Sequence, residues 1–175
     1  ALRWPLISPS FPYQEGSAAG VPRRRLRHRS LTMPSRGIRQ PRQSGGIGLQ
    51  GQVRPLTLVT AFSAASHATA FTLWSFPGFL PGADEPIIHI SRPDTMAIPR
   101  RARVRGHRGQ FFGDEIVALD GLLVTSRPRT WLDCSRKMSI NELTVVADHL
   151  LRIPRPEFEG RTDPHATMEE LADML

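Results

Sequence analysis

The run over residues 116–135 constrains the fold of this chain more than any other stretch. Residues 116–119 are apolar and β-prone, and Asp120-Gly121 is a two-residue signal for a β-hairpin. A type I′ turn requires positive φ, which glycine adopts without steric cost. Residues 122–125 form the expected return strand, and a hydroxyl group at its end caps a helix expected near 128–137. The run therefore predicts strand, turn, strand and helix, and it carries no catalytic chemistry of its own.

Other segments supply further elements of the same kind. Alternation and β-branched residues predict strands over 87–91 and 102–108. We expect these two strands and the hairpin to form a small antiparallel sheet. The spacing of apolar residues predicts one helix over 56–76. In the packed domain we place this helix near 57–75. Two further helices are predicted at capping boxes, in which a hydroxyl residue caps the helix and a glutamate three residues later reaches back. These boxes open helices over 139–152 and 167–175. The fold class predicted is α+β.

Charge is distributed unevenly along the chain. Of the 23 Lys and Arg residues, ten lie in residues 1–83, where Glu15 is the one acidic residue, whereas residues 84–175 carry 13 basic and 15 acidic groups. A basic half beside a near-neutral half indicates an anionic partner for the first half. The alternative is a solvated basic tail. The single Cys134 excludes an internal disulfide and is typical of a reducing cytoplasm. No apolar run approaches the ~18 residues that a membrane span needs.

The most basic segment covers residues 21–39. Pro22 opens a short helix expected over 22–29, with Leu26 facing inward and the arginines facing outward. Arginine contacts phosphates and guanine edges, so a basic helix followed by a strand predicts a DNA groove reader with a wing. A charged surface helix is the alternative interpretation. The residues predicted to contact DNA are Arg23, Arg24, Arg25, Arg27, His28, Arg29, Arg36 and Arg39.

The chain is expected to have three parts. Residues 1–20 are rich in Pro, Ser, Gly and Ala and predict a disordered or irregular tail. Residues 21–55 form the basic arm and a linker, which is rich in Gln and Gly from residue 40 onward. Its Gly-Gly-Ile-Gly run has no following Lys-Ser/Thr and does not predict a phosphate loop. Residues 56–175 form the α+β domain.

Histidine and cysteine offer few candidates for catalysis or metal binding. His89 and His107 lie on strands that we expect to be neighbours, so their rings approach each other. A metal site needs a third ligand, and because the sequence has no compact Cys/His cluster we expect no metal and no cofactor. His67 has no partner at helical spacing and is interpreted as a packed or capping residue.

A Cys-His-Asp catalytic set would require Cys134, His149 and Asp133 to converge. Adjacent helical residues point about 100° apart, so Asp133 and Cys134 do not aim at one point. Cys134 is interpreted as a small buried residue near Trp131, and Asp133 as an ion-pair partner of Arg129. We expect no catalytic residues.

Several motifs resemble those of a large actinobacterial family. Ser66-His-Ala-Thr-Ala70 with Leu73-Trp74 resembles its "SHxTAAxLWGLP" helix, and the Asp120-Gly-Leu-Leu-Val-Thr-Ser run with Arg129-Thr-Trp-Leu-Asp133 resembles "DGLPVTSPARTLLDLA". Residues 21–38 are similar to its "GVSRRRLRR…RGVYR" segment. These proteins have an N-terminal half similar to AbiEi, the antitoxin of type IV abortive-infection systems, and many add an endonuclease domain related to very-short-patch repair nucleases.

The resemblance implies a winged helix-turn-helix, of which residues 21–39 match the recognition helix and wing. It also implies an antitoxin-like, non-enzymatic DNA-binding regulator in the cytoplasm that binds a cognate toxin or a second copy of itself. The nuclease domain is absent, because its Asp/Glu-x-Lys site needs a lysine and the single Lys137 follows Ser135 by two residues. Two alternatives remain: the nucleic-acid-positioning accessory half of an endonuclease protein, and a truncated, non-functional fragment. The start at Ala1 and the abrupt C-terminal end favour a fragment.

Overall fold

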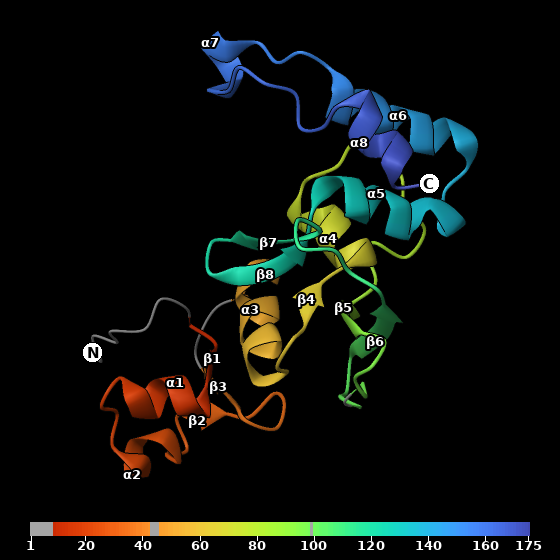
Figure 1. The fold of residues 1–175 in the computed structure, drawn as a ribbon. Coiled ribbons are helices and arrows are strands. Elements are labelled where there is room, and N and C mark those ends of the chain that lie inside the picture. The colour runs from red at the N-terminus through yellow and green to blue at the C-terminus, as the bar shows by residue number, and fades with distance from the viewer. Residues whose placement is uncertain (1–8, 43–45, 99) are drawn as a thin grey trace.

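The computed structural model describes residues 9–42, 46–98 and 100–175. Two sheets organise these residues, a small one near the N-terminus and a larger one in the middle of the molecule (Figure 1). The small sheet has the order β1-β3-β2 and the large one the order β6-β5-β4-β8-β7. Helices lie beside both sheets, so the fold is α+β, as predicted.

Residues 9–42 form an N-terminal module around the small antiparallel sheet. Its elements are β1 (Phe11–Pro12), α1 (Tyr13–Ala18), α2 (Arg23–Leu26), β2 (Leu31–Thr32) and β3 (Ile38–Pro41). The expectation of a disordered or irregular segment over 1–20 is therefore wrong for residues 11–18. Phe11 is almost fully buried, and this burial orders a segment whose composition alone favours irregular structure. Residues 1–8 lie outside the described residues.

The single helix expected over 56–76 is wrong. The chain instead forms α3 (Leu49–Val59), β4 (Ala64–Ala65) and α4 (His67–Leu73). Phe62 and His67 have φ values of 56° and 50°, which a continuous right-handed helix cannot contain. Because α3 begins at residue 49, the linker expected over 40–55 is also shorter than predicted. Packing of α3 against the sheet outweighs the weak helix propensity of its Gly51 and Pro55.

The large sheet is mixed rather than antiparallel. It contains β4, β5 (Ile88–Pro93), β6 (Val104–Gly109), β7 (Ile116–Leu119) and β8 (Leu122–Thr125). The β5–β6 and β4–β8 pairs are parallel, whereas the β4–β5 and β7–β8 pairs are antiparallel.

The parallel β5–β6 pair depends on the return path of the connecting loop. A Cβ built on Gly106 would lie 1.9 Å from Cγ2 of Ile98, so the loop side chain occupies the space that glycine leaves above β6. The loop thus runs back along the sheet before β6 begins. The alternating pattern of residues 102–108 predicts a strand but does not encode its direction, which explains the wrong expectation.

The hairpin and the helices that follow it agree with the prediction. Asp120 and Gly121 both have positive φ, as a type I′ turn requires. Ser126 caps α5 (Arg127–Cys134), which continues as η1 (Ser135–Lys137). Both predicted capping boxes are present, at the starts of α6 (Ile140–Leu151) and α8 (Met168–Asp173). A one-turn helix, α7 (Pro156–Glu159), lies between α6 and α8.

Two hydrophobic cores hold these layers together. One lies between α3, β3 and the large sheet and includes Val53, Leu56 and Val124. The other joins α4, α5, α6 and α8 through residues such as Phe71 and Leu150. In Figure 1 the N-terminal module and the α6–α8 layer lie at opposite ends of the molecule. Among the described residues, no helix is both long and apolar enough to cross a membrane.

Candidate nucleic-acid interface

The N-terminal module presents two short helices joined by a tight turn. The N–H of Val21 donates to the carbonyl of Gly16 at 3.0 Å, and the N–H of Gly20 donates to that of Ser17 at 3.1 Å. This pair of bonds, with Gly20 at φ +78°, is a Schellman ending. Pro22 then starts α2 with its φ already at −57°. The turn therefore redirects the chain within four residues.

Close packing brings α1 and α2 together. A Cβ on Gly16 would lie 2.8 Å from Cδ2 of Leu26 and 2.8 Å from Cε2 of Phe11. Leu26 and Phe11 are both almost fully buried. Glycine at position 16 thus allows the apolar side of α2 to lie directly on α1, which turns the opposite side of α2 outward.

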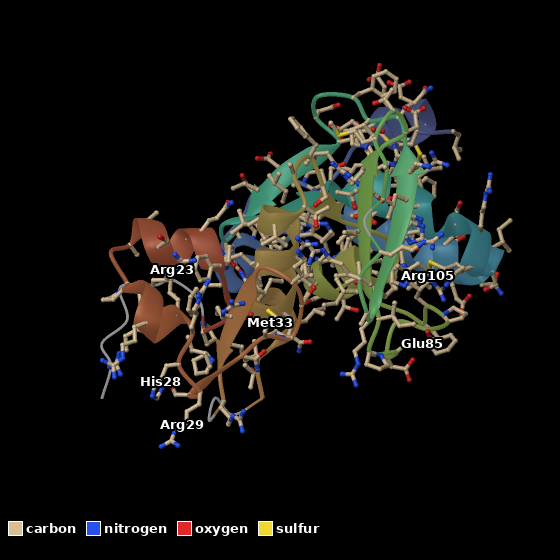
Figure 2. All side chains as sticks on the ribbon, turned by 90° about the horizontal axis from the view of Figure 1, so that it is seen from below. Arg23, His28, Arg29, Met33, Glu85 and Arg105 are labelled. Carbon is tan, nitrogen blue, oxygen red and sulfur yellow. The ribbon has the colours of Figure 1, made fainter. Side chains whose placement is uncertain are left out.

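The outward side of α2 and the segment after it is basic, as predicted. The side chains of Arg23, Arg24, Arg25, Arg27, His28 and Arg29 are exposed. Figure 2 shows Arg23, His28 and Arg29 on this part of the molecule. None of them forms an ion pair within the part of the chain that the structure describes. Their positive charge is therefore available to an external anion.

A β-hairpin follows this helix pair, and the two remaining predicted contacts lie on it. Arg36, in the loop between β2 and β3, is exposed. Arg39 is half-buried: its Nε donates to the carbonyl of Leu26 at 2.9 Å, its Nη1 donates to that of Ile38, and its guanidinium lies over the ring of Tyr13. Arg39 thus fastens α2 to β3, and its expected contact with DNA stays a prediction.

A partly buried ion pair helps to attach the module to the rest of the chain. Glu15 of α1 accepts two hydrogen bonds from Arg54 of α3, at 3.0 and 2.8 Å. Arg54 is only 8% exposed, so this bidentate contact fixes the orientation of α1 on α3. The one acidic residue in the first 83 is therefore structural, and it neutralises none of the exposed arginines.

Sequence reasoning missed α1 and its role as the scaffold of α2. Helix α1 has six residues, too short for a periodic apolar pattern. A usable signal is present nonetheless, since a run of small residues ends at Gly20 and is followed by Pro22, the order expected where one helix stops and another starts.

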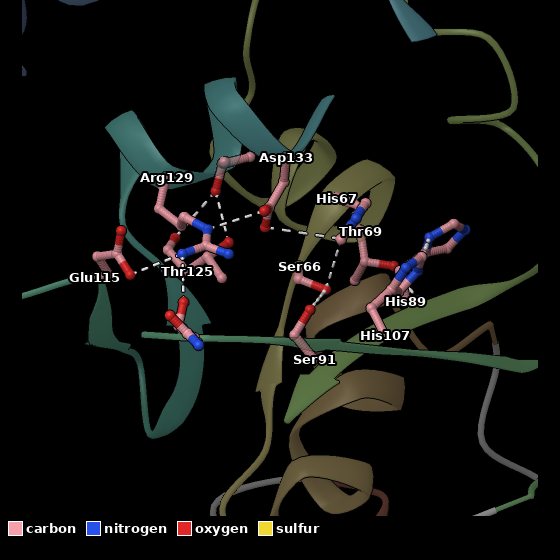
Figure 3. Close-up of polar contacts among 12 residues, drawn as sticks. Ser66, His67, Thr69, His89, Ser91, His107, Glu115, Thr125, Arg129 and Asp133 are labelled. Atoms are coloured by element: carbon pink, nitrogen blue, oxygen red, sulfur yellow. Dashed lines mark hydrogen bonds and ion pairs between the residues drawn. The ribbon is translucent and has the colours of Figure 1, made fainter. Parts of the chain in front are cut away.

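A second candidate site is a polar network in the α+β domain (Figure 3). Arg129 donates to Glu115 at 2.8 Å and to Asp133 at 2.9 Å, which confirms the predicted Arg129–Asp133 pair. The side chains of Glu115 and Asp133 are 4% and 8% exposed. Burial raises the pKa of Asp133, and the charge of Arg129 opposes that shift.

Three histidines gather beside this network. Nδ1 of His89 lies 3.0 Å from Nε2 of His107, which confirms the predicted approach of these rings. His67 stacks on His107 with ring centroids 3.7 Å apart. Burial, reinforced by neighbouring positive charge, lowers the pKa of each ring to about 4. The rings are therefore neutral at pH 7, and His67 has the partner that helical spacing did not reveal.

The histidine cluster does not assemble into a metal centre. Nδ1 of His67 lies 3.1 Å from Oγ of Ser66 and 3.7 Å from Oδ2 of Asp133. Within residues 9–42, 46–98 and 100–175, no group of three or more His, Cys, Asp or Glu side chains has a geometry that could hold a metal ion. The cluster packs α4 and α5 against β5 and β6.

Cys134 does not have the properties of a nucleophile. It is 1% exposed within the core that Trp131 also contacts, as predicted. Burial raises the pKa of its thiol to about 12, so the thiolate is not formed at neutral pH. Asp133 is engaged by Arg129 rather than by a catalytic histidine.

Comparison with known proteins adds no further assignment: the chain matches no protein-family model and no curated protein.

Proposed function

We propose that the chain is an antitoxin-like, non-enzymatic DNA-binding regulator and that its N-terminal module is a winged helix-turn-helix. One observation carries the proposal: α2 and the residues after it expose arginines that form no ion pair among the described residues, while Leu26 anchors the helix on α1. Exposed arginines on a short helix beside a hairpin suit contacts with DNA phosphates and base edges. The hairpin between β2 and β3 serves as the wing.

The rest of the proposal concerns partners. The α+β domain binds a cognate toxin or a second copy of the chain. In the cytoplasm, binding to DNA represses the operon that encodes the chain and its toxin. The resemblance of the Asp120–Ser135 run to antitoxin-like proteins supports this part. The absence of a thiolate at Cys134 and the engagement of Asp133 by Arg129 support a non-enzymatic role.

Selection of binding sequences from a randomised duplex pool tests the proposal. We expect the intact chain to enrich a defined site, with each mismatch costing about 1–3 kcal/mol. The triple variant Arg23→Ala/Arg24→Ala/Arg25→Ala should weaken binding by roughly tenfold or more. Arg136→Ala, which removes an exposed arginine from η1, is the matched control and should bind as the parent does.

Two results would contradict the proposal. Equal binding by the parent and the triple variant would remove α2 from the interface. Duplex cleavage by the purified chain with Mg²⁺ would contradict the non-enzymatic role and favour the endonuclease-related alternative.

A further inference from the structure

A hollow of about 540 Å³ lies between the loop of the β2–β3 hairpin and the loop that precedes β6. Its lining residues come from both loops, and they are Pro34, Ser35, Arg36, Arg100, Arg101 and Ala102. Three of these carry a guanidinium group and none carries a carboxylate. The hollow therefore lies between the N-terminal module and the α+β domain, and positive charge is concentrated in its lining.

Arg101 holds the two loops in place. Its Nη1 donates to Oγ of Ser35 at 2.8 Å and to the carbonyl of Arg36 at 2.8 Å. The backbone beside Arg36 is therefore fixed relative to the loop that carries Arg100 and Arg101. The guanidinium groups are presented by a fixed frame rather than by two independent loops.

No carboxylate of the described residues pairs with the positive charge in the hollow. The ion pairs of the described residues include none of Arg36, Arg100 and Arg101. Nε of Arg101 is buried without a hydrogen-bond partner among those residues. Burial, and then the nearby charge of Arg36, lower the pKa of Arg101. An anion bound among these groups would offset the repulsion between their like charges.

We propose that this hollow is a phosphate-binding site, in which the guanidinium groups of Arg36 and Arg100 and the frame set by Arg101 receive a phosphate of the nucleic-acid backbone. Guanidinium groups bind phosphate oxygens bidentately, and Ser35 supplies a hydroxyl at the edge of the hollow. The choice of nucleic acid as the source of the phosphate rests on the proposed function. Because Arg100 and Arg101 precede β6, this site extends the proposed interface from the winged helix onto the α+β domain.

The double variant Arg36→Ala/Arg100→Ala tests this site, with Arg136→Ala as the control. Both substituted arginines are exposed, and their side chains form no ion pair in the described structure, so the variant should fold. The first measurement is the thermal midpoint in inorganic phosphate against chloride at equal ionic strength. We expect a rise of a few degrees for the parent and the control, and a clearly smaller rise for the double variant.

The second measurement is duplex affinity as a function of salt. The double variant should lower the log–log slope by about 1, since the one phosphate held in the hollow contributes roughly 0.9. The double variant could keep the salt slope of the parent and yet lose the rise in thermal midpoint that phosphate causes. That result would assign the site to free phosphate and overturn the nucleic-acid assignment. An unchanged phosphate effect would overturn the site itself. Failure of the parent to bind any duplex would contradict the proposed function, and the phosphate measurement would still decide the site.

Discussion

The N-terminal module and the α+β domain use arginine in opposite ways. In the module, Arg23, Arg24 and Arg25 are exposed and form no ion pair with the residues that the structure describes. In the domain, Arg129 is 14% exposed and lies between two buried carboxylates. The difference shows that the position of arginine relative to acidic residues, rather than its abundance, separates a binding surface from a structural network.

The two regions also differ in how they are stabilised. One hydrophobic core lies within the domain, and the other is shared with the module through Ile38. Inside the module itself, the buried large side chains include Phe11 and Leu26. The module is therefore held on α3 by Ile38 and by the ion pair between Glu15 and Arg54. A small internal core, one shared apolar contact and one partly buried ion pair hold its basic surface in place.

The largest effect on stability should come from removing Arg129, which pairs with Glu115 and Asp133 in the α+β domain. Arg129→Ala leaves Glu115 and Asp133 buried without a counterion, and we expect it to lower the free energy of unfolding by about 3–5 kcal/mol. Urea denaturation measures this change. Arg136→Ala should stay within about 0.5 kcal/mol of the parent. A similar, small cost for both variants would contradict the structural role of the network.

In the module, the sharpest packing constraint is at Gly16. Gly16→Ala places a methyl group against Leu26 and the ring of Phe11, so we expect a loss of about 1–3 kcal/mol. The loss should appear as faster amide hydrogen exchange in α1 and α2, with the large sheet unaffected. Uniform loss of protection in both regions would show that the module and the domain unfold as one unit.

Acid should destabilise the domain through its histidines. His67, His89 and His107 have a folded pKa near 4 and an unfolded pKa near 6.5, so the unfolded chain binds more protons between these values. Stability is therefore complete above about pH 6.5 and falls as the pH decreases toward 4. Asp133, whose folded pKa is raised, opposes this trend above its unfolded value of 3.8.

Thermal unfolding at pH 7.5 and pH 5 measures the acid effect. We expect the midpoint to fall by several degrees, since about 1 kcal/mol corresponds to 2–4 °C in a chain of this size. His67→Asn/His107→Asn should show a smaller fall, with His89, His149 and His165 responsible for the remainder. An equal fall in the double variant would show that the buried cluster does not cause the acid sensitivity.

The smallest stability effect should separate two arginines within the module. Arg39→Ala loses hydrogen bonds to Leu26 and Ile38 and should cost about 1–2 kcal/mol. Arg24→Ala should change stability by less than about 0.5 kcal/mol but lower the salt slope of duplex binding by about 1. If Arg24→Ala lowered stability and Arg39→Ala lowered the salt slope instead, the DNA-contact and structural roles of these two residues would be reversed.

Local signals were enough to predict part of this structure. The Asp120-Gly121 turn and the box opened by Ser139 depend on residues within four positions of each other, and both are present. The outward arginines of α2 follow from one buried position, Leu26. These features need no information about distant parts of the chain.

Features set by distant contacts could not be predicted in the same way. The direction of β6 depends on Ile98 filling the space above Gly106, and the break before α4 depends on positive φ at His67. His67 lacked a partner at helical spacing because that partner, His107, lies on another strand. The hollow at Arg36 and Arg101 was likewise hidden, because its two loops are far apart in sequence.

The salt dependence of duplex binding by the intact chain tests the central claim most directly. Binding through four to six exposed arginines predicts a log–log slope of roughly −3.5 to −5.5 between about 50 and 200 mM salt. The triple variant at Arg23, Arg24 and Arg25 should reduce the steepness of that slope by about 2–3. A slope near zero, or no binding at low salt, would contradict the assignment of the N-terminal module as a nucleic-acid interface.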